Sequence, residues 1–383
     1  MGPRGRDGRS AGANHAGRTI GEIPTVVSLH QLLEDMIPKR ASDLHITAGV
    51  PPVYRIDGAM DPSVHEILTP EMTIHLAYSL LSDDQRKRFE TTKELDFSFG
   101  IKGLSRFRAN VFLQRGVVSM VIRQIPYEIL QMEKLGLPTV VNEFTKRQKG
   151  FVLVTGPTGS GKSTTLAAML DRINANRQSH IITVEDPIEY IHMNKKCVVN
   201  QREVGNDTSS FANALKYVLR QDPDIILIGE MRDLETIEAA LTIAETGHLV
   251  FATLHTNSAY EAVNRIVDVF PSDQQKQILT QLAFTLEGVV TQQLIPRSSA
   301  KGRVMCAEVL VCTPAIKAVI REGKTHQIYS LMQAGQKYGM QTMNQGLLQA
   351  VLDKSLSREH AMERTGDRAE LEGMLSHVVR KVA

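Results

Sequence analysis

The second half of the chain alternates between short, uninterrupted apolar runs and amphipathic stretches. Four apolar runs stand out, in the sequences GFVLVTG, HIITVED, DIILIGE and HLVFATLH, which begin at residues 150, 180, 224 and 248. Near-continuous apolar runs are typical of central strands in a parallel sheet, because helices cover both faces of such a sheet. Helical patterns lie between the runs, so this region is predicted to be a doubly wound α/β core.

The pattern before residue 125 is of a different kind. Apolar positions at helical spacing over residues 29–37 predict an amphipathic helix. Short strands are expected at 43–46 and 53–56, followed by helix starts at Thr69-Pro70-Glu71 and at the capping box Ser82–Gln85. Three further strands are expected in LDFSFG, SRFRANVF and VSMVIRQI. This mixed order predicts an α+β domain rather than repeated βαβ units.

These changes of pattern divide the chain into four parts. Residues 1–27 are predicted to be a disordered basic tail, because they are rich in glycine and arginine and nearly free of apolar residues. Residues 28–124 form the expected N-terminal domain. Residues 125–138, with prolines at 126 and 138, are the expected linker. The α/β domain then spans 139–383 and is predicted to be mostly helical after Thr313.

Charge and cysteine content narrow the classes of function. The formal net charge is +2, and the first twenty residues carry four arginines and one aspartate, so the body is nearly neutral. A nearly neutral body argues against a nucleic-acid groove. No signal peptide or apolar run of about 18 residues is present, which predicts a cytoplasmic protein. The three cysteines form no C-x-x-C pair, which excludes a four-cysteine zinc site.

The most specific motif follows the first apolar run. GPTGSGKS, residues 156–163, fits the phosphate-loop pattern G-x-x-x-x-G-K-[ST] between an expected strand and an expected helix. We expect Lys162 to reach the β- and γ-phosphates of ATP, Ser163 to ligate Mg²⁺ and Thr164 to contact the α-phosphate. The predicted nucleotide-binding residues are Gly156, Pro157, Thr158, Gly159, Ser160, Gly161, Lys162, Ser163 and Thr164.

Carboxylates end two of the apolar runs. In parallel sheets the carboxyl ends of strands face the ligand crevice, so Glu230 is predicted to orient the attacking water. The alternative for Glu230 is a structural ion pair with Arg232. Glu185 ends HIITVE and is expected to be a catalytic residue that supports Mg²⁺ through water. Asp186, next to it, is an alternative site residue or a solvent-facing acid of an Asp-Pro turn.

Two histidines flank the fourth apolar run. His248 precedes it and His255 follows it, so they cannot share one metal ion locally. Both are predicted to sense the γ-phosphate. The alternative is that each has a structural role only.

The phosphate loop, HIITVEDPIEY, DIILIGEMRD and ETGHLVFATLHTN together resemble the motifs of the secretion-superfamily hexameric ATPases. In that family's terms they are similar to Walker A, the Asp box, an atypical Walker B with Gly-Glu, and the His box. Within the superfamily the chain resembles the PilT-type retraction ATPases of type IV pili, over roughly residues 28–355. PAIKAVIREGK, from residue 314, is similar to the helix used in retraction, although Lys317, Ala318 and Val319 depart from the usual residues.

The resemblance implies an N-terminal PAS-like domain followed by a RecA-like ATPase domain, assembled as a homohexamer that hydrolyses Mg-ATP. It implies arginines that neutralise the γ-phosphate, and we name Arg106, Arg108, Arg123 and Arg220 as candidates, with an ordinary surface role as the alternative for each. It also implies an inner-membrane pilus platform protein as partner, together with a paralogous pilus ATPase. We expect membrane contact only through partners, at the cytoplasmic base of the pilus machine.

Three alternatives stay open. A pilus-extension or type II secretion ATPase has a similar core but usually adds a large N-terminal domain and a four-cysteine zinc module, neither of which is expected here. FLQRGVVSMVIRQI and VVTQQLIP are similar to PilU-like accessory ATPases, which favours a module that docks on another ring. A RecA-like DNA motor is disfavoured by the nearly neutral charge of the body.

Overall fold

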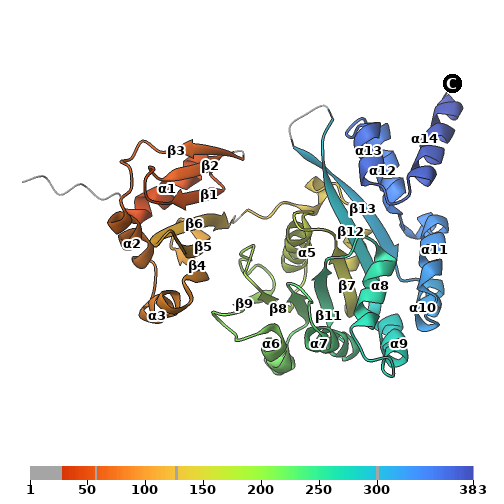
Figure 1. Cartoon of the computed structure of the whole chain (residues 1–383). Coiled ribbons are helices and arrows are strands. Elements are labelled where there is room, and N and C mark those ends of the chain that lie inside the picture. Colours follow the sequence, from red (N-terminus) through yellow and green to blue (C-terminus); the bar gives the residue numbers. More distant parts are fainter. Residues whose placement is uncertain (1–27, 57, 126–127, 299–301, 383) are drawn as a thin grey trace, which may run out of the picture. The chain divides into compact units, whose positions relative to one another are not determined.

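The computed structural model describes residues 28–56, 58–125, 128–298 and 302–382. The predicted disordered tail, residues 1–27, lies outside the described residues. The chain divides into two compact units. Of the described residues, those from 28 to 99 and from 107 to 124 belong to the first unit, and Gly100–Arg106 together with those from 125 onward belong to the second. Each unit is built around its own sheet (Figure 1).

The first unit contains a six-stranded sheet in the order β3-β2-β1-β6-β5-β4. Strand β1 pairs antiparallel with both β2 and β6. Helix α1 begins after the N-cap Ser28 and buries its apolar face, as the helical spacing predicts. The elements are α1 (Leu29–Lys39), β1 (Asp43–Ile46), β2 (Val53–Ile56), β3 (Ala59–Pro62), α2 (Pro70–Tyr78), α3 (Asp83–Thr92), β4 (Glu94–Ile101), β5 (Ser105–Gln114) and β6 (Val117–Ile125).

The second unit contains a seven-stranded sheet in the order β13-β12-β7-β11-β10-β8-β9. Strands β7, β11, β10 and β8 are the four predicted apolar runs, and they pair in parallel. Strand β9 extends this parallel set at one edge, and the antiparallel hairpin of β12 and β13 ends the sheet at the other. The strands are β7 (Gly150–Thr155), β8 (His180–Glu185), β9 (Val198–Glu203), β10 (Ile225–Ile228), β11 (Leu249–Leu254), β12 (Leu286–Pro296) and β13 (Arg303–Val311).

Helices cover both faces of this sheet, which confirms the predicted α/β class (Figure 1). Ile226 and Ile228 of β10 pack in the cluster that contains residues of α7, α8 and α9. Ile225 and Leu227 of the same strand face the opposite way, into the cluster that contains residues of α5. A strand that is buried on both faces is expected to be apolar throughout, as this one is.

The helices of the second unit connect the strands and then form its C-terminal part. Asp233 caps the N-terminus of α7, where its side chain accepts a hydrogen bond from the backbone N–H of Thr236. The helices are α4 (Val141–Phe144), α5 (Lys162–Asn176), α6 (Phe211–Val218), α7 (Leu234–Glu245), α8 (Ala259–Asp268), α9 (Gln275–Thr285), α10 (Pro314–Arg321), α11 (Ile328–Ala334), α12 (Met343–Leu352), α13 (Arg358–Arg364) and α14 (Arg368–Val382).

Candidate functional site

The phosphate loop joins the end of β7 to the start of α5. Its glycines 156, 159 and 161 all have positive φ, which glycine adopts without strain. A Cβ on Gly156 would lie 2.4 Å from the carbonyl oxygen of Gln292, so no other residue fits there. The loop therefore presents backbone rather than side chains to a ligand at the N-terminus of α5, where N–H groups favour phosphate.

Lys162 closes the loop on itself. Its Nζ donates to the carbonyl oxygens of Gly156, at 2.8 Å, and Pro157, at 3.1 Å. Burial lowers the pKa of Lys162, and the charges of Glu230 and Glu189 oppose that shift. The ammonium group therefore already lies beside the loop. To contact a phosphate it would exchange its hydrogen bonds to the two carbonyl oxygens for bonds to phosphate oxygens.

The hairpin of β12 and β13 supports the loop from behind. The side chain of Gln292 donates to the carbonyl oxygen of Ser160 at 2.9 Å, and Thr155 shares a hydrogen bond with Thr291. The sequence interpretation did not identify Gln292. Its partner lies 132 residues away along the chain, and no local pattern indicates such a contact.

Glu230 follows β10 and lies between two cationic or potentially cationic groups. One carboxylate oxygen lies 3.1 Å from Nε2 of His255, and the other accepts a hydrogen bond from Arg232 at 2.8 Å. The hydrogen bond from Arg232 is the main cause that lowers the pKa of Glu230, and His255 adds to the effect. The predicted ion pair with Arg232 is thus present, and it keeps the carboxylate ionised rather than removing it from the site.

The two predicted histidines lie at opposite ends of β11. His255 follows the carboxyl end and reaches Glu230. His248 precedes the strand, and its Nδ1 lies 3.1 Å from both the carbonyl oxygen of Ile243 and the hydroxyl of Thr246, at the end of α7. The structure therefore brings His255 to Glu230 at the carboxyl end of β11 and places His248 at the opposite end of the strand.

Gly229, the residue directly before Glu230, has surroundings that leave little room for a larger side chain. A Cβ at Gly229 would lie 3.2 Å from Cα of Glu185 and 3.3 Å from the carbonyl oxygen of Val184. The backbone N–H of Gly229 also donates to that carbonyl, at 2.8 Å. The ends of β10 and β8 thus approach so closely that an aspartate side chain would crowd Glu185.

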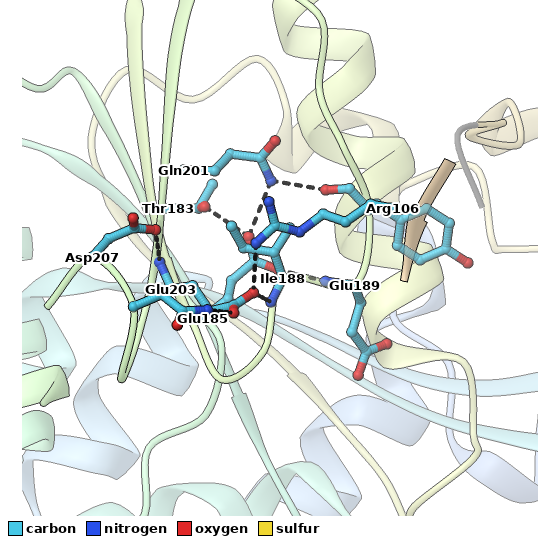
Figure 2. A network of polar contacts seen from close by, with 10 residues as sticks. Arg106, Thr183, Glu185, Ile188, Glu189, Gln201, Glu203 and Asp207 are labelled. Atoms are coloured by element: carbon cyan, nitrogen blue, oxygen red, sulfur yellow. Dashed lines mark hydrogen bonds and ion pairs between the residues drawn. The ribbon is translucent and has the colours of Figure 1, made fainter. Parts of the chain in front are cut away.

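Glu185 accepts hydrogen bonds from two neutral side chains and one backbone N–H (Figure 2). Its Oε1 accepts hydrogen bonds from Thr183 at 2.7 Å and from Gln201 at 3.2 Å, and its Oε2 accepts the backbone N–H of Glu189 at 3.4 Å. Burial raises the pKa of Glu185 to about 7, and the hydrogen bonds oppose the shift only in part. Full ionisation of this carboxyl calls for a positive charge nearby.

The loop after β8 returns to the first turn of α5. The hydroxyl of Tyr190 lies 2.8 Å from Oγ1 of Thr164, so this threonine is paired within the chain. His192 is buried, and burial lowers its pKa to about 4. Tyr190 and Gln201 were not identified from the sequence. Gln201 lies on the edge strand β9, and its residue type alone indicates no role.

The oxygen ligands that the sequence predicts for Mg²⁺ face one small cavity. This cavity of about 30 Å³ is lined by Ser163, Glu185 and Tyr190 among others, and such a volume has room for at least one water molecule. Within the described ranges, no group of three or more His, Cys, Asp or Glu side chains could hold a metal ion by itself. A hydroxyl and a carboxylate fit Mg²⁺, which keeps several waters and takes further ligands from substrate phosphates.

The four candidate arginines have different surroundings. Arg106, in the stretch that groups with the second unit, donates to the buried carboxylate of Glu203 at 3.0 Å (Figure 2). Arg123 pairs with Asp43 at 2.8 Å, and Arg108 lies 3.7 Å from Asp96. Arg220 is exposed beside the ring of Tyr217. Their roles toward a phosphate stay predictions.

Two further findings concern the class of protein. The cysteines at 197, 306 and 312 are buried and form no disulfide. Among the helices that the structure describes, none has the length and apolar content needed to span a bilayer.

Comparison with known proteins gives consistent results along nearly the whole chain. Residues 19–363 match the family model described as "Type II/IV secretion system protein". A Pseudomonas aeruginosa protein, "Type IV pilus retractation ATPase PilT", is 49% identical over 88% of this chain and 98% of its own length. "Type IV pilus ATPase PilU" of the same organism is 42% identical over 91% of each.

A solved structure agrees with these sequence matches. The crystal structure of "the Pilus Retraction Motor PilT and Bound ADP" superimposes with a TM-score of 0.86 and 50% sequence identity. It covers 90% of this chain and 99% of its own.

Proposed function

Because this chain belongs to the type II/IV secretion system protein family, and within it to the PilT-type retraction ATPases, we propose that it is a Mg-dependent ring motor. It couples ATP hydrolysis to pilus retraction. One observation supports the proposal most strongly. Glu230, Glu185 and a complete phosphate loop lie at the carboxyl ends of parallel strands in one sheet.

The residues at these strand ends have separate roles in binding the nucleotide. The backbone N–H groups of the loop bind the phosphate chain, and Lys162 leaves the carbonyl oxygens of Gly156 and Pro157 for the β- and γ-phosphates. Ser163 and Glu185, which line the same cavity, would hold the magnesium ion, Glu185 through water. When bound, the ion neutralises charge that develops on the β- and γ-phosphate oxygens.

Glu230 is the residue that orients water for attack on the γ-phosphate. Its lowered pKa keeps it ionised at neutral pH, which a group that accepts a proton from water requires. His255 contacts the same carboxylate and is placed to sense whether the γ-phosphate is present. His248, at the opposite end of β11, would act across an interface with a neighbouring subunit.

Arginines complete the charge balance of the transition state. We assign this role to one or more of Arg106, Arg108, Arg123 and Arg220. Removal of an arginine that contacts the transferred phosphoryl group costs about 10³–10⁵ in kcat. An arginine with only a surface role would cost almost nothing, so single substitutions separate the two roles.

The proposed assembly is a homohexamer at the cytoplasmic base of the pilus machine. Closure and reopening of successive subunits would turn an inner-membrane platform protein and withdraw pilin subunits from the fibre. The platform protein, a paralogous pilus ATPase and contact with the membrane only through partners belong to the proposal. No nucleic acid takes part in it.

ATP turnover of the purified chain, with light scattering on the same sample, tests the proposal. A hexamer that hydrolyses ATP only with Mg²⁺, and that loses turnover in Lys162→Ala, is the expected result. A folded hexamer without turnover would contradict an autonomous motor.

A second function is favoured by the 42% identity to the protein described as "Type IV pilus ATPase PilU". On that account the chain is an accessory module that docks on another ring. It would bind nucleotide alone and hydrolyse it only in the presence of the paralogous ATPase, which the same assay distinguishes when the paralogue is added.

A further inference from the structure

The side chain of Gln201, on the edge strand β9, joins three separate points of the site (Figure 2). Its Nε2 donates to the Glu185 carboxylate at 3.2 Å and to the carbonyl oxygen of Tyr190 at 2.8 Å. Its Oε1 accepts the backbone N–H of His192 at 2.8 Å. All three bonds converge on the segment that leads from β8 into the loop beside the phosphate site.

The register of the sheet places this amide where it can make these contacts. Gln201 pairs with Thr183 in the parallel ladder of β8 and β9, and Glu185 lies two residues farther along on the same face. Thr183 donates to the same carboxylate oxygen as Gln201. Two neutral donors on adjacent strands therefore fix the direction in which the Glu185 carboxylate points.

The other two bonds of Gln201 determine where Tyr190 lies. Because the amide holds the Tyr190 carbonyl and the next-but-one N–H, it fixes the backbone on both sides of residue 191. The Tyr190 hydroxyl then meets Thr164, in the first turn of the helix that carries the phosphate loop. Asn174 of the same helix holds the far end of this segment, through the carbonyl of Met193 and the N–H of Lys195.

We propose that Gln201 is a positioning residue for ATP hydrolysis. It holds the Glu185 carboxylate toward the metal side of the site and the Tyr190 hydroxyl against the phosphate-loop helix. This inference rests on the proposed function, and it deepens that function by assigning to the edge strand a part in the reaction. Gln201 itself does not line the cavity that Ser163 and Glu185 face.

Only an amide of this length supplies the required set of groups. Glutamate would keep the acceptor for the His192 N–H, but it would lose both donors and bring a second carboxylate beside Glu185. Methionine has a similar length and provides none of the three bonds. Asparagine is one methylene shorter, so it cannot span the same three partners.

Asn200 provides a matched control on the same strand. Adjacent residues of a strand point to opposite faces, and the Asn200 amide bonds the ring of His180 at the start of β8. Asn200→Leu therefore removes an amide from β9 without touching Glu185, Tyr190 or His192. A general weakening of the edge strand should appear in this variant as well.

The experiment compares the full-length parental chain with Gln201→Met, Gln201→Glu and Asn200→Leu. For each, oligomeric state, melting temperature and affinity for a fluorescent ADP analogue are measured first. Steady-state kcat and KM for ATP are then measured over a series of Mg²⁺ concentrations. Hydrogen–deuterium exchange of the peptide that covers residues 188–193 reports on the loop without any need for turnover.

We expect Gln201→Met to lower kcat by about 10- to 100-fold, the usual cost of removing a partner that orients a metal-associated carboxylate. KM for ATP and affinity for the ADP analogue should stay near parental values, and half-saturation with Mg²⁺ should need a higher concentration. Exchange over residues 188–193 should become faster. Gln201→Glu should also have a lower kcat, but its His192 backbone amide should exchange more slowly than in Gln201→Met. Asn200→Leu should match the parental chain in all these measurements.

Three results would overturn the inference. The first is parental kcat and Mg²⁺ dependence in Gln201→Met, and the second is an equal loss in Asn200→Leu. The third is a lower melting temperature with unchanged kcat, because that would show structural support only. If the parental chain hydrolysed no ATP, the proposed function would fail by itself, and unchanged exchange in Gln201→Met would still refute the contact with the loop.

Discussion

The ends of the neighbouring strands β8 and β10 each present a glutamate, yet their surroundings are opposite in character. Glu185 is buried among neutral donors, and burial raises its pKa to about 7. Glu230 lies between Arg232 and His255, and its pKa is lowered. When two acids of one site have pKa values pushed apart, they are suited to different roles. Glu230 is ready to accept a proton at neutral pH, whereas Glu185 is only partly ionised there, and a cation beside it would favour its charged form.

The largest effect is expected from Glu230→Gln. This substitution keeps the shape of the side chain but removes the proton acceptor, so turnover should fall by about 10²–10⁴-fold. Affinity for the ADP analogue should hardly change, because the proposed role of Glu230 is toward the γ-phosphate, which ADP lacks. Steady-state ATP turnover and nucleotide titration measure the two quantities. Normal turnover in this variant would refute the catalytic role of Glu230.

The second effect is a dependence of stability on pH that belongs to Glu185. Its folded-state pKa, about 7, lies above the ordinary glutamate value of 4.5, so the folded protein binds more protons than the unfolded chain between these pH values. This contribution to stability is therefore present at low pH and is lost as pH rises through that window. It amounts to about 3 kcal/mol when the whole window has been crossed.

Urea unfolding without Mg²⁺, at several pH values, measures this contribution as the difference between the parental chain and Glu185→Gln. The difference should grow from pH 4.5 to 7 and then level off. Glu230→Gln provides the contrast, because a lowered pKa gives stability that is present at higher pH and lost as pH falls. A flat difference for Glu185→Gln would show that Glu185 is not in the surroundings described.

The smallest effect concerns the close approach of the two strand ends. In Gly229→Ala the new methyl group would lie 3.2 Å from Cα of Glu185, so the end of β8 must shift by a few tenths of an ångström. We expect the free energy of unfolding to fall by about 1 kcal/mol. Gly366→Ala is the matched control, because a Cβ there meets nothing within 4 Å. Equal stability of the two variants in urea would argue against crowding at Gly229.

The sequence was most informative where one residue type decides the outcome. Strands β7, β8, β10 and β11 were predictable because burial on both faces leaves only apolar residues. Phosphate loop and strand-end acids were predictable because their positions follow from the strands. By contrast, β3 escaped prediction because all four of its residues are exposed and leave no apolar pattern. Strand β9, at the sheet edge, alternates too weakly to be recognised.

The contacts that orient the site were beyond the reach of sequence patterns. Gln201 and Gln292 act through amides whose partners are set by strand register and by a hairpin far along the chain. The spacing of His248 and His255 already indicated that they flank one strand. Only the structure shows that His255 contacts Glu230 and that His248 contacts the end of α7 instead. The pKa difference between Glu185 and Glu230 likewise depends on burial and on neighbours from other elements.

The most direct test of two carboxylates with two roles is a Mg²⁺ titration of ATP turnover in Glu185→Gln and Glu230→Gln, side by side with the parental chain. The account predicts that Glu185→Gln loses about 10- to 100-fold in turnover and needs more Mg²⁺ for half-saturation, because it has lost a metal-holding carboxylate. Glu230→Gln should keep its low turnover at every Mg²⁺ concentration, and that residual turnover should need as much Mg²⁺ for half-saturation as the parental chain does. Rescue of Glu230→Gln by excess Mg²⁺, with Glu185→Gln indifferent to it, would contradict the account.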